Sequence, residues 1–494
     1  MLEAIPLALV EVMDPLYIAM VAMGVFVGCI IGILPGIGAI VSMALMLGFC
    51  FSLKPAAGLG LIIGAGAVCV TADTITCVLM GVPGTVGSMA TIMDGYPLAK
   101  KGEASRALGA AFTASMIGGI IGAICLTAVI PIALPLIKNL RSPHLFMLAL
   151  LGIIMVSTLG GRAPVKGLGS AAIGMLLSAV GVAQFVWVTR FTGGVLYLQD
   201  GVPLVVVALG IFALPELIEL VIRGTQISEF PLLGKGIYSG VKDALKRIGL
   251  VFRCSIIGAI IGFIPGMGQS AANWFAYGYV VNSSKDRDKF GKGEIRGVIA
   301  PESANNACVG GAIIPTVLFG IPGSGSMGLL LGAFLILGIQ PGLPMLTENL
   351  HITLSMIWTL AMANVLAGIL CLVATRPLAL LTTVKVQYLV PFILTIVLVG
   401  AFQSTRHWLD LLILPILGIF GWLMKRYGWP RPALFVAFLL GNVAERYLYI
   451  TLEVFGATCL YDPGVIVIFI IIILVLYLAF FRRRKLEVRE EGEV

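Results

Sequence analysis

The sequence predicts an all-α polytopic membrane protein with roughly 11–14 helical segments, arranged as inverted-topology repeats with discontinuous helices. Three observations lead to this fold class. The composition is very apolar, apolar stretches recur from end to end, and both halves of the chain carry the same Pro-Gly pairs in hydrophobic surroundings.

The composition is that of a membrane protein. Of the 494 residues, 59% are hydrophobic and 11% are charged, whereas a soluble domain carries about 25% charged residues. Apolar stretches of about 20 residues, long enough to cross a bilayer as helices, follow one another along the chain. The nine cysteines form no CxxC pair, so we expect them to act as small apolar residues and to bind no metal. The net charge of +8 resides in short loops, which is typical of membrane orientation and does not indicate nucleic-acid binding.

Basic residues between the apolar stretches predict the orientation. The last stretch is followed at once by RRRK (482–485), so the positive-inside rule places the C-terminus in the cytoplasm. Counting back one stretch at a time leaves the N-terminus outside. The same count puts the other basic segments inside, namely 100–106, 162–166, 223–253, 285–296, 376–385 and 425–431. Arg406, beside Asp410, lies outside as an exception. We therefore expect a multi-pass protein of the cell (inner) membrane.

An internal repeat relates the two halves. GCIIGILPGIGA (28–39) matches GAIIGFIPGMGQ (258–269) at an offset of 230 residues, and GVPGT (81–85) matches GIPGS (320–324) at an offset of 239. The nine additional residues correspond to the charged insert KDRDKFGKG (285–293). Because the first copy begins outside and the second inside, we expect inverted repeats over 1–235 and 236–481, with a tail at 482–494. A parallel duplication with one misassigned span is the alternative.

The Pro-Gly pairs predict helices that break inside the membrane. Proline removes a backbone donor and glycine permits unusual backbone angles. Groups freed in this way survive at membrane depth only where protein or a water-filled cavity satisfies them. Four such pairs, at 35–36, 83–84, 265–266 and 322–323, therefore predict discontinuous helices that meet near the midplane. Close helix packing through small residues is the alternative.

The broken ends predict a binding site for an anion such as a carboxylate. Helix N-termini present free N–H groups and a positive dipole end, and neighbouring hydroxyls add donors without charge. The candidate substrate-binding residues are Pro35, Gly36, Gly38, Gly84, Thr85, Ser88, Ser303, Asn305, Asn306, Gly323, Ser324 and Ser326.

The segment APESANNACVGGAIIP (300–315) places several polar residues, Glu302 among them, before an apolar stretch. Two amides entering the membrane are costly unless they bind something or each other. Their carbonyl oxygens suit Na⁺ and their NH₂ groups suit a carboxylate. An N-cap at Ser303 or Asn305 is the competing interpretation.

Asp73 is the candidate coupling residue, together with Thr74 and Asn305. It lies in an apolar run, VTADTIT (70–76), and a carboxylate within the membrane is by default a candidate proton carrier or cation ligand. The alternative is a structural aspartate bonded to Thr71, Thr74 or nearby backbone. The chain has no Walker A motif, no histidine-rich metal pattern and no GxSxG, so we expect neither an enzyme nor a cofactor.

These blocks resemble the large membrane subunit of the tripartite tricarboxylate transporter family. The resemblance covers about residues 10–425 and is strongest in GILPGIGA (32–39) and in the segments 81–115, 300–326 and 338–342. It implies an ion-gradient-driven importer of carboxylates that works with a small membrane subunit and an extracytoplasmic binding protein. The family's breaks and amide pair correspond to Pro35, Gly36, Gly38, Pro83, Gly84, Pro322, Gly323, Asn305 and Asn306. Where the family usually has Gly-Gly-Ser, this chain has Ala72-Asp73-Thr74, which leaves the substrate and the coupling ion open.

We therefore expect a secondary active transporter that imports tricarboxylates or dicarboxylates together with Na⁺ or H⁺ by alternating access. The alternatives are an anion channel that uses the broken helices as a filter, and a stand-alone permease for another small anion.

Overall fold

A computed structural model describes residues 4–34, 36–159, 163–183, 186–223, 233–384 and 386–491. Within these ranges, nine helices are long and apolar enough to cross a membrane, and three shorter apolar helices, such as Gly38–Leu47, accompany them. The predicted all-α polytopic fold is confirmed.

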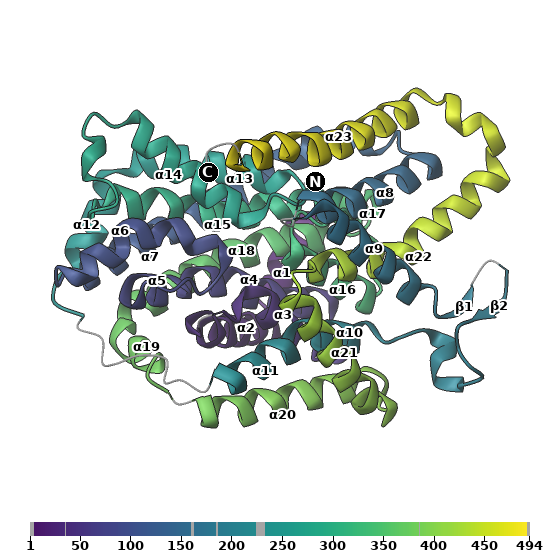
Figure 1. The fold of residues 1–494 in the computed structure, drawn as a ribbon, viewed down its shortest axis with the longest axis horizontal. Coiled ribbons are helices and arrows are strands. Elements are labelled where there is room, and N and C mark those ends of the chain that lie inside the picture. Colours follow the sequence, from purple (N-terminus) through teal and green to yellow (C-terminus); the bar gives the residue numbers. More distant parts are fainter. Residues whose placement is uncertain are drawn as a thin grey trace.

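The helices pack around α4, which is buried at every residue but its first, and a small hairpin projects at the right edge of Figure 1. The first helices are α1 (Ala4–Val12), α2 (Pro15–Ile33), α3 (Gly38–Leu47), α4 (Pro55–Ala72), α5 (Thr74–Met80), α6 (Met89–Lys100), α7 (Ala104–Ile137), α8 (Ser142–Leu159) and α9 (Pro164–Ser178). The antiparallel hairpin consists of β1 (Gly181–Ala183) and β2 (Val188–Arg190). The next helices are α10 (Leu204–Ala208), α11 (Leu214–Arg223), α12 (Ile237–Lys246), α13 (Ile248–Phe263), α14 (Gly268–Ser283), α15 (Arg296–Phe319), α16 (Gly325–Ile336) and α17 (Leu343–Leu346). The last are α18 (Leu350–Val373), α19 (Thr375–Leu381), α20 (Val386–Thr405), α21 (Leu409–Arg426), α22 (Arg431–Val454) and α23 (Pro463–Glu491).

The helix breaks lie where the Pro-Gly pairs predict them. α2 gives way to α3 around Gly36, and α13 gives way to α14 around Gly266. Both glycines have a φ of 84°, a backbone conformation that side chains with a Cβ rarely adopt. The helix is also interrupted between α5 and α6 and between α15 and α16, at the two other Pro-Gly pairs. The prediction of discontinuous helices is therefore confirmed, although Pro35 itself lies outside the described residues.

Within each copy of the repeat, the two breaks contact each other. The N–H of Gly36 donates to the carbonyl of Gly84 at 3.3 Å, and the N–H of Gly266 donates to the carbonyl of Gly323 at 3.0 Å. These pairs are related by the offsets of 230 and 239 residues that relate the sequence blocks. We refer to α2–α7 as the first repeat unit and to α13–α18 as the second.

Close packing of helices on glycine accompanies the breaks. A Cβ on Gly28 of α2 would lie 2.4 Å from the carbonyl oxygen of Ala65 in α4. A Cβ on Gly258 of α13 would lie 2.1 Å from the carbonyl oxygen of Ala304 in α15, the pair equivalent by both offsets. Distances below 3 Å leave no room for a side chain, so these glycines bring the two helices together. Small-residue packing thus occurs beside the breaks and does not replace them.

Segments that the charge rule assigns to one side of the membrane contact each other. Among the segments predicted inside, the Lys101 ammonium donates to the carbonyl of Lys292 at 2.5 Å, and the Arg106 guanidinium donates to Asp243 at 2.7 Å. On the predicted outside, Glu11 pairs with His351 at 3.6 Å. These contacts fit the predicted order of crossings.

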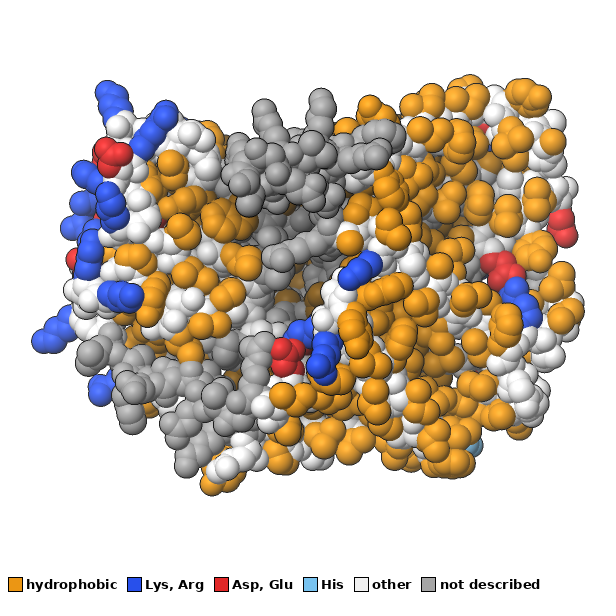
Figure 2. Space-filling model, viewed as in Figure 1, with side chains coloured by type: hydrophobic (Ala, Val, Ile, Leu, Met, Phe, Trp, Pro, Cys, Tyr) orange, Lys and Arg blue, Asp and Glu red, His pale blue; other side chains and the backbone are white. Residues whose placement is uncertain are grey.

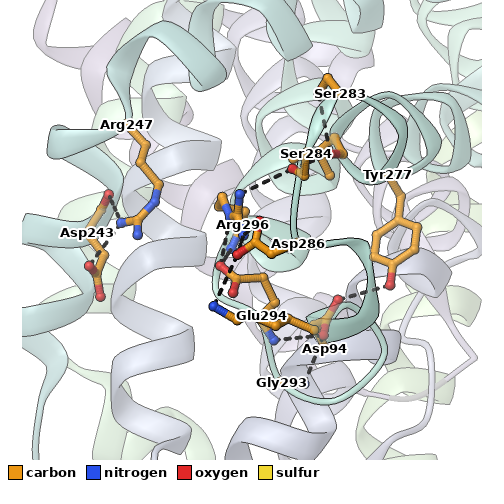
Figure 3. Close-up of polar contacts among 12 residues, drawn as sticks. Asp94, Asp243, Arg247, Tyr277, Ser283, Ser284, Asp286, Gly293, Glu294 and Arg296 are labelled. Carbon is orange, nitrogen blue, oxygen red and sulfur yellow. Dashed lines mark hydrogen bonds and ion pairs between the residues drawn. The ribbon is translucent and has the colours of Figure 1, made fainter.

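One predicted-inside cluster fastens the second repeat unit to the first. Asp94 of α6 is fully buried and accepts hydrogen bonds from the backbone N–H groups of Gly293 and Glu294, at 2.9 and 2.8 Å, and from the Tyr277 hydroxyl at 2.9 Å (Figure 3). We call these four residues the Asp94 cluster. Lysines and arginines gather around this end of the molecule, along the left edge of Figure 2. The charged insert predicted from the repeat offsets is therefore part of the junction between the units.

A second set of charges holds the insert itself in shape. Arg296 donates to both oxygens of Asp286 at 2.9 Å and to Glu294 at 2.9 Å (Figure 3). The hydrogen bonds from Arg296 and then from Lys289 lower the pKa of Asp286 to about 2, so its carboxylate stays ionised at any physiological pH.

The topology is testable with single cysteines in a background without the nine native ones. We expect Lys289→Cys and Thr347→Cys, both on exposed loops, to react with a membrane-impermeant maleimide from opposite sides of the membrane. Trp187→Cys, in the hairpin, should react from the same side as Thr347→Cys. Labelling of Lys289→Cys and Thr347→Cys from the same side would contradict the inverted arrangement.

Candidate functional site

Asp73 lies at the junction of α4 and α5 and is fully buried. Its Oδ2 accepts a hydrogen bond from the Thr85 hydroxyl at 2.5 Å, and its Oδ1 has no hydrogen-bond partner among the described residues. The first repeat unit's break lies directly against it, since a Cβ on Gly84 would be 2.5 Å from the Cβ of Asp73. The candidate coupling residue is therefore part of the broken-helix region, with one carboxylate oxygen unused.

Glu302 of α15 is a second fully buried carboxylate in the same region. It accepts hydrogen bonds from the hydroxyls of Thr91 at 2.6 Å, Thr74 at 2.9 Å and Ser115 at 2.9 Å. These hydroxyls come from α6, α5 and α7, so three helices of the first repeat unit donate hydrogen bonds to an acid of the second. Sequence reasoning noted Glu302 as polar but gave it no role, because its three partners lie 187 to 228 residues away in the chain.

Asn305 lies inside a helix and not at its start. Because α15 begins at Arg296, Ser303 and Asn305 are in its interior, and the N-cap interpretation is wrong for both. Neither the oxygen nor the nitrogen of the Asn305 amide has a hydrogen-bond partner among the described residues. The amide faces Gly87 of the first repeat unit, where a Cβ would lie 2.6 Å from the Asn305 oxygen and 2.9 Å from Gln269 of α14. An unpaired buried amide costs about 1–3 kcal/mol, which marks it as a group available to a ligand.

Asn306 differs from its neighbour because its NH₂ group is bonded on both sides. It donates to the Thr71 hydroxyl and to the Asn364 side-chain oxygen, each at 2.7 Å. Those partners belong to α4 and α18, so Asn306 joins three helices. Its own oxygen has no partner among the described residues.

The candidate hydroxyls are bonded within the protein. Thr85 and Ser324 each accept from a backbone N–H group at the start of the helical segment that follows the break, and so act as N-caps. Ser88 donates to the carbonyl of Thr85 at 3.1 Å, and Ser326 pairs with Ser324 at 2.9 Å. Ser303 donates to a carbonyl of its own helix. Helix-end N–H groups that were expected to be free for an anion are thus partly capped.

One small cavity lies between the repeat units, close to the breaks. Gln269 and Ser326 line a cavity of about 10 Å³ with apolar residues of α3, α4, α15 and α16. A volume of this size holds no more than one water molecule. This cavity is too small for an organic anion.

The two ionisable side chains of the site are both acids. Neither Asp73 nor Glu302 forms an ion pair with a lysine, arginine or histidine of the described chain, and both are fully buried. Buried charges are ordinarily paired with an opposite charge or with a cation. The two acids of the site therefore have no balancing basic side chain among the described residues.

A repeated set of broken helices around a buried polar centre is typical of polytopic membrane transport proteins. Residues 18–436 match the family model described as the tripartite tricarboxylate transporter TctA family. The chain belongs to that family, which is a family of transporters.

Two relatives from Agrobacterium vitis are similar to this chain. An uncharacterized 52.8 kDa protein in the TAR-I ttuC′ 3′ region is 30% identical over 440 residues, which cover 88% of this chain and 87% of the relative. An uncharacterized protein in the TAR-II ttuC′ 3′ region is 32% identical over 191 residues, 39% of this chain and 79% of that protein. No solved structure matches the chain significantly.

The two amides should differ in what their removal does to stability. Asn306→Ala leaves Thr71 and Asn364 without a donor, so we expect a loss of about 1–3 kcal/mol and a lower Tm for the purified protein in detergent. Asn305→Ala removes no hydrogen bond of the described protein and should leave Tm unchanged or raise it. Equal destabilisation by both variants would contradict this assignment.

Proposed function

We propose that the chain is a secondary active transporter that imports organic tricarboxylates or dicarboxylates with Na⁺ or H⁺ by alternating access. It acts with a small membrane subunit and an extracytoplasmic binding protein, as the word tripartite in the family description suggests. The observation that carries the proposal is the set of unused polar atoms, Asp73 Oδ1 and the Asn305 amide, at the junction of broken helices from both repeat units.

The charge of the site favours symport with a cation. A carboxylate that approaches Asp73 and Glu302 meets like charge, and two unit charges about 4 Å apart repel by about 4 kcal/mol at an effective dielectric constant of 20. Protons or Na⁺ bound at these acids remove the repulsion, so substrate and cation bind together more strongly than either alone. Carboxylate and amide oxygens are suitable ligands for such a hard cation.

We assign the coupling ion to Asp73 and the substrate to the amide side of the site. Glu302 already has three hydroxyl donors, whereas Asp73 Oδ1 has none and is adjacent to the break at Gly84. The Asn305 NH₂ group suits a carboxylate, and its oxygen suits a cation. A contact path through Thr85 and Gly87 connects the two residues.

Two features support alternating access. The cavity between the units is too small for an organic anion, so we expect binding to require movement of one unit against the other. The Asp94 cluster fastens the units at the predicted cytoplasmic end, so it must open for release on that side. In this assignment the N-terminus lies outside and the C-terminus in the cytoplasm of the cell membrane.

An anion channel is a weaker candidate, because the described centre offers two acids and no fixed cation to an anion. The test is citrate and succinate uptake into proteoliposomes that contain this chain with its membrane subunit, with the binding protein outside. We expect saturable accumulation that disappears when ionophores dissipate the Na⁺ and proton gradients. Flux that stays linear in concentration and persists without any gradient would instead identify a channel.

Asp73→Asn should separate coupling from substrate movement. The amide keeps the shape and the bond from Thr85 but removes the charge, so we expect gradient-driven citrate accumulation to fail while citrate exchange across the membrane continues. Glu302→Gln provides the matched control, because we expect it to lower both activities together through its three hydroxyl contacts. Wild-type accumulation by Asp73→Asn would show that another residue carries the coupling charge.

A further inference from the structure

A second cavity lies away from the central site, at the base of the β1–β2 hairpin. It has a volume of about 560 Å³, within the range of small-molecule sites. Its walls are the end of α9, the hairpin, the 3₁₀ segment Leu196–Asp200 and the middle of α22. Figure 1 shows the hairpin projecting from the right edge of the molecule, near α22.

Two arginines on this cavity have unused donors. Arg190 of β2 pairs with Glu445 through one terminal nitrogen at 2.9 Å, while its Nε is buried and has no hydrogen-bond partner among the described residues. Arg446, which follows Glu445 in α22, lines the cavity and is exposed, and it forms no ion pair within the described chain. Asn442, one turn earlier on the same helix, adds an amide to the lining. A guanidinium edge with a free Nε is suited to a carboxylate.

The cavity opens on the side that the charge rule places outside. Tyr197 of the Leu196–Asp200 segment donates a hydrogen bond to Asp410, which is predicted outside together with Arg406. The opposite end of α9 is tied to the predicted inside, where the Lys166 ammonium donates to the carbonyl of Tyr427 at 2.7 Å. The two ends of α9 are separated by the 15 residues of the helix, which correspond to about 22 Å at 1.5 Å per residue.

We propose that this cavity is an entry site that binds a carboxylate group of the substrate before it reaches the centre. Arg446 and the free Nε edge of Arg190 hold the carboxylate, and Asn442 donates a further hydrogen bond. The inference rests on the proposed function for the identity of the ligand. It adds a second site, which offers two arginines beside two acids, Glu445 and Asp200, whereas the central site offers acids alone.

Glu445 keeps the affinity of this entry site low. Its carboxylate occupies one edge of Arg190, so an incoming carboxylate competes with it and leaves again readily. A site that passes its ligand onward requires such weak binding, because tight binding would trap the substrate outside. The two acids on the cavity, Glu445 and Asp200, therefore act in the opposite direction to the two arginines.

The transport test compares neutral variants of Arg446 and Glu445, which line the cavity, with a neutral variant of Arg406, which does not. We expect Arg446→Gln to raise the half-saturating citrate concentration about tenfold, the cost of one charge-assisted hydrogen bond, and Arg446→Lys to restore most of the loss. Arg406→Gln, which removes an exposed arginine on the same predicted side but outside the cavity, should have no effect. Glu445→Gln should lower the half-saturating concentration. A rise with Glu445→Gln, or no change with Arg446→Gln, would overturn the proposal.

A labelling test is independent of coupled transport. In a cysteine-free background, Asn442→Cys is exposed to a membrane-impermeant maleimide. We expect citrate alone to slow its labelling, to do so equally when Asp73→Asn is also present, and to lose this effect when Arg446→Gln is present. Protection that survives Arg446→Gln, or that requires the binding protein instead of citrate, would overturn the entry site. A wild-type protein that takes up neither citrate nor succinate, yet shows citrate protection, would count against the proposed function and not against this site.

Discussion

A backbone group released inside a membrane helix finds no water, so the protein must supply its partner. In this chain that requirement is met where Gly36 bonds to Gly84 and Gly266 bonds to Gly323. Each repeat unit must therefore bring its two breaks together. The glycine contacts of α2 on α4 and of α13 on α15 make this possible, because they remove the side chains that would hold the helices apart. The polar centre of the molecule exists because these breaks meet in the protein interior and not in lipid.

The backbone of the centre is repeated, but its chemistry is not. The position equivalent to Asp73 in the second repeat unit is Ala312, and both lie against the corresponding break glycine. The second unit instead contributes Glu302 and Asn305 from α15, which face hydroxyls and backbone of the first unit. One acid thus comes from each unit, and the site is complete only when both units are in place. Relative movement of the units changes the surroundings of both acids, which is the property that a coupled transporter requires.

The fixed charges differ along the proposed path of a carboxylate. The outer cavity presents two arginines together with Glu445 and Asp200, whereas the centre presents buried acids without a basic side chain among the described residues. In the proposed function the first arrangement attracts the substrate, and the second makes its onward movement conditional on the coupling ion. This difference in charge gives a physical basis for import against a concentration gradient without a fixed cation at the centre.

The sequence by itself determined the fold class, the two repeats, the positions of the breaks and the family, because hydropathy and Pro-Gly pairs act on a few neighbouring residues. It also identified Asp73 and the amide pair as polar residues that need partners. Only the tertiary structure decided which partners they have. It placed Asn305 inside a helix and not at an N-cap, left its amide unpaired while bonding Asn306, and surrounded Glu302 with three hydroxyls. The cavity beside Arg190 was equally invisible in the sequence. Such features depend on contacts between residues about 200 or more positions apart, and no local pattern specifies which distant side chains will share a buried site.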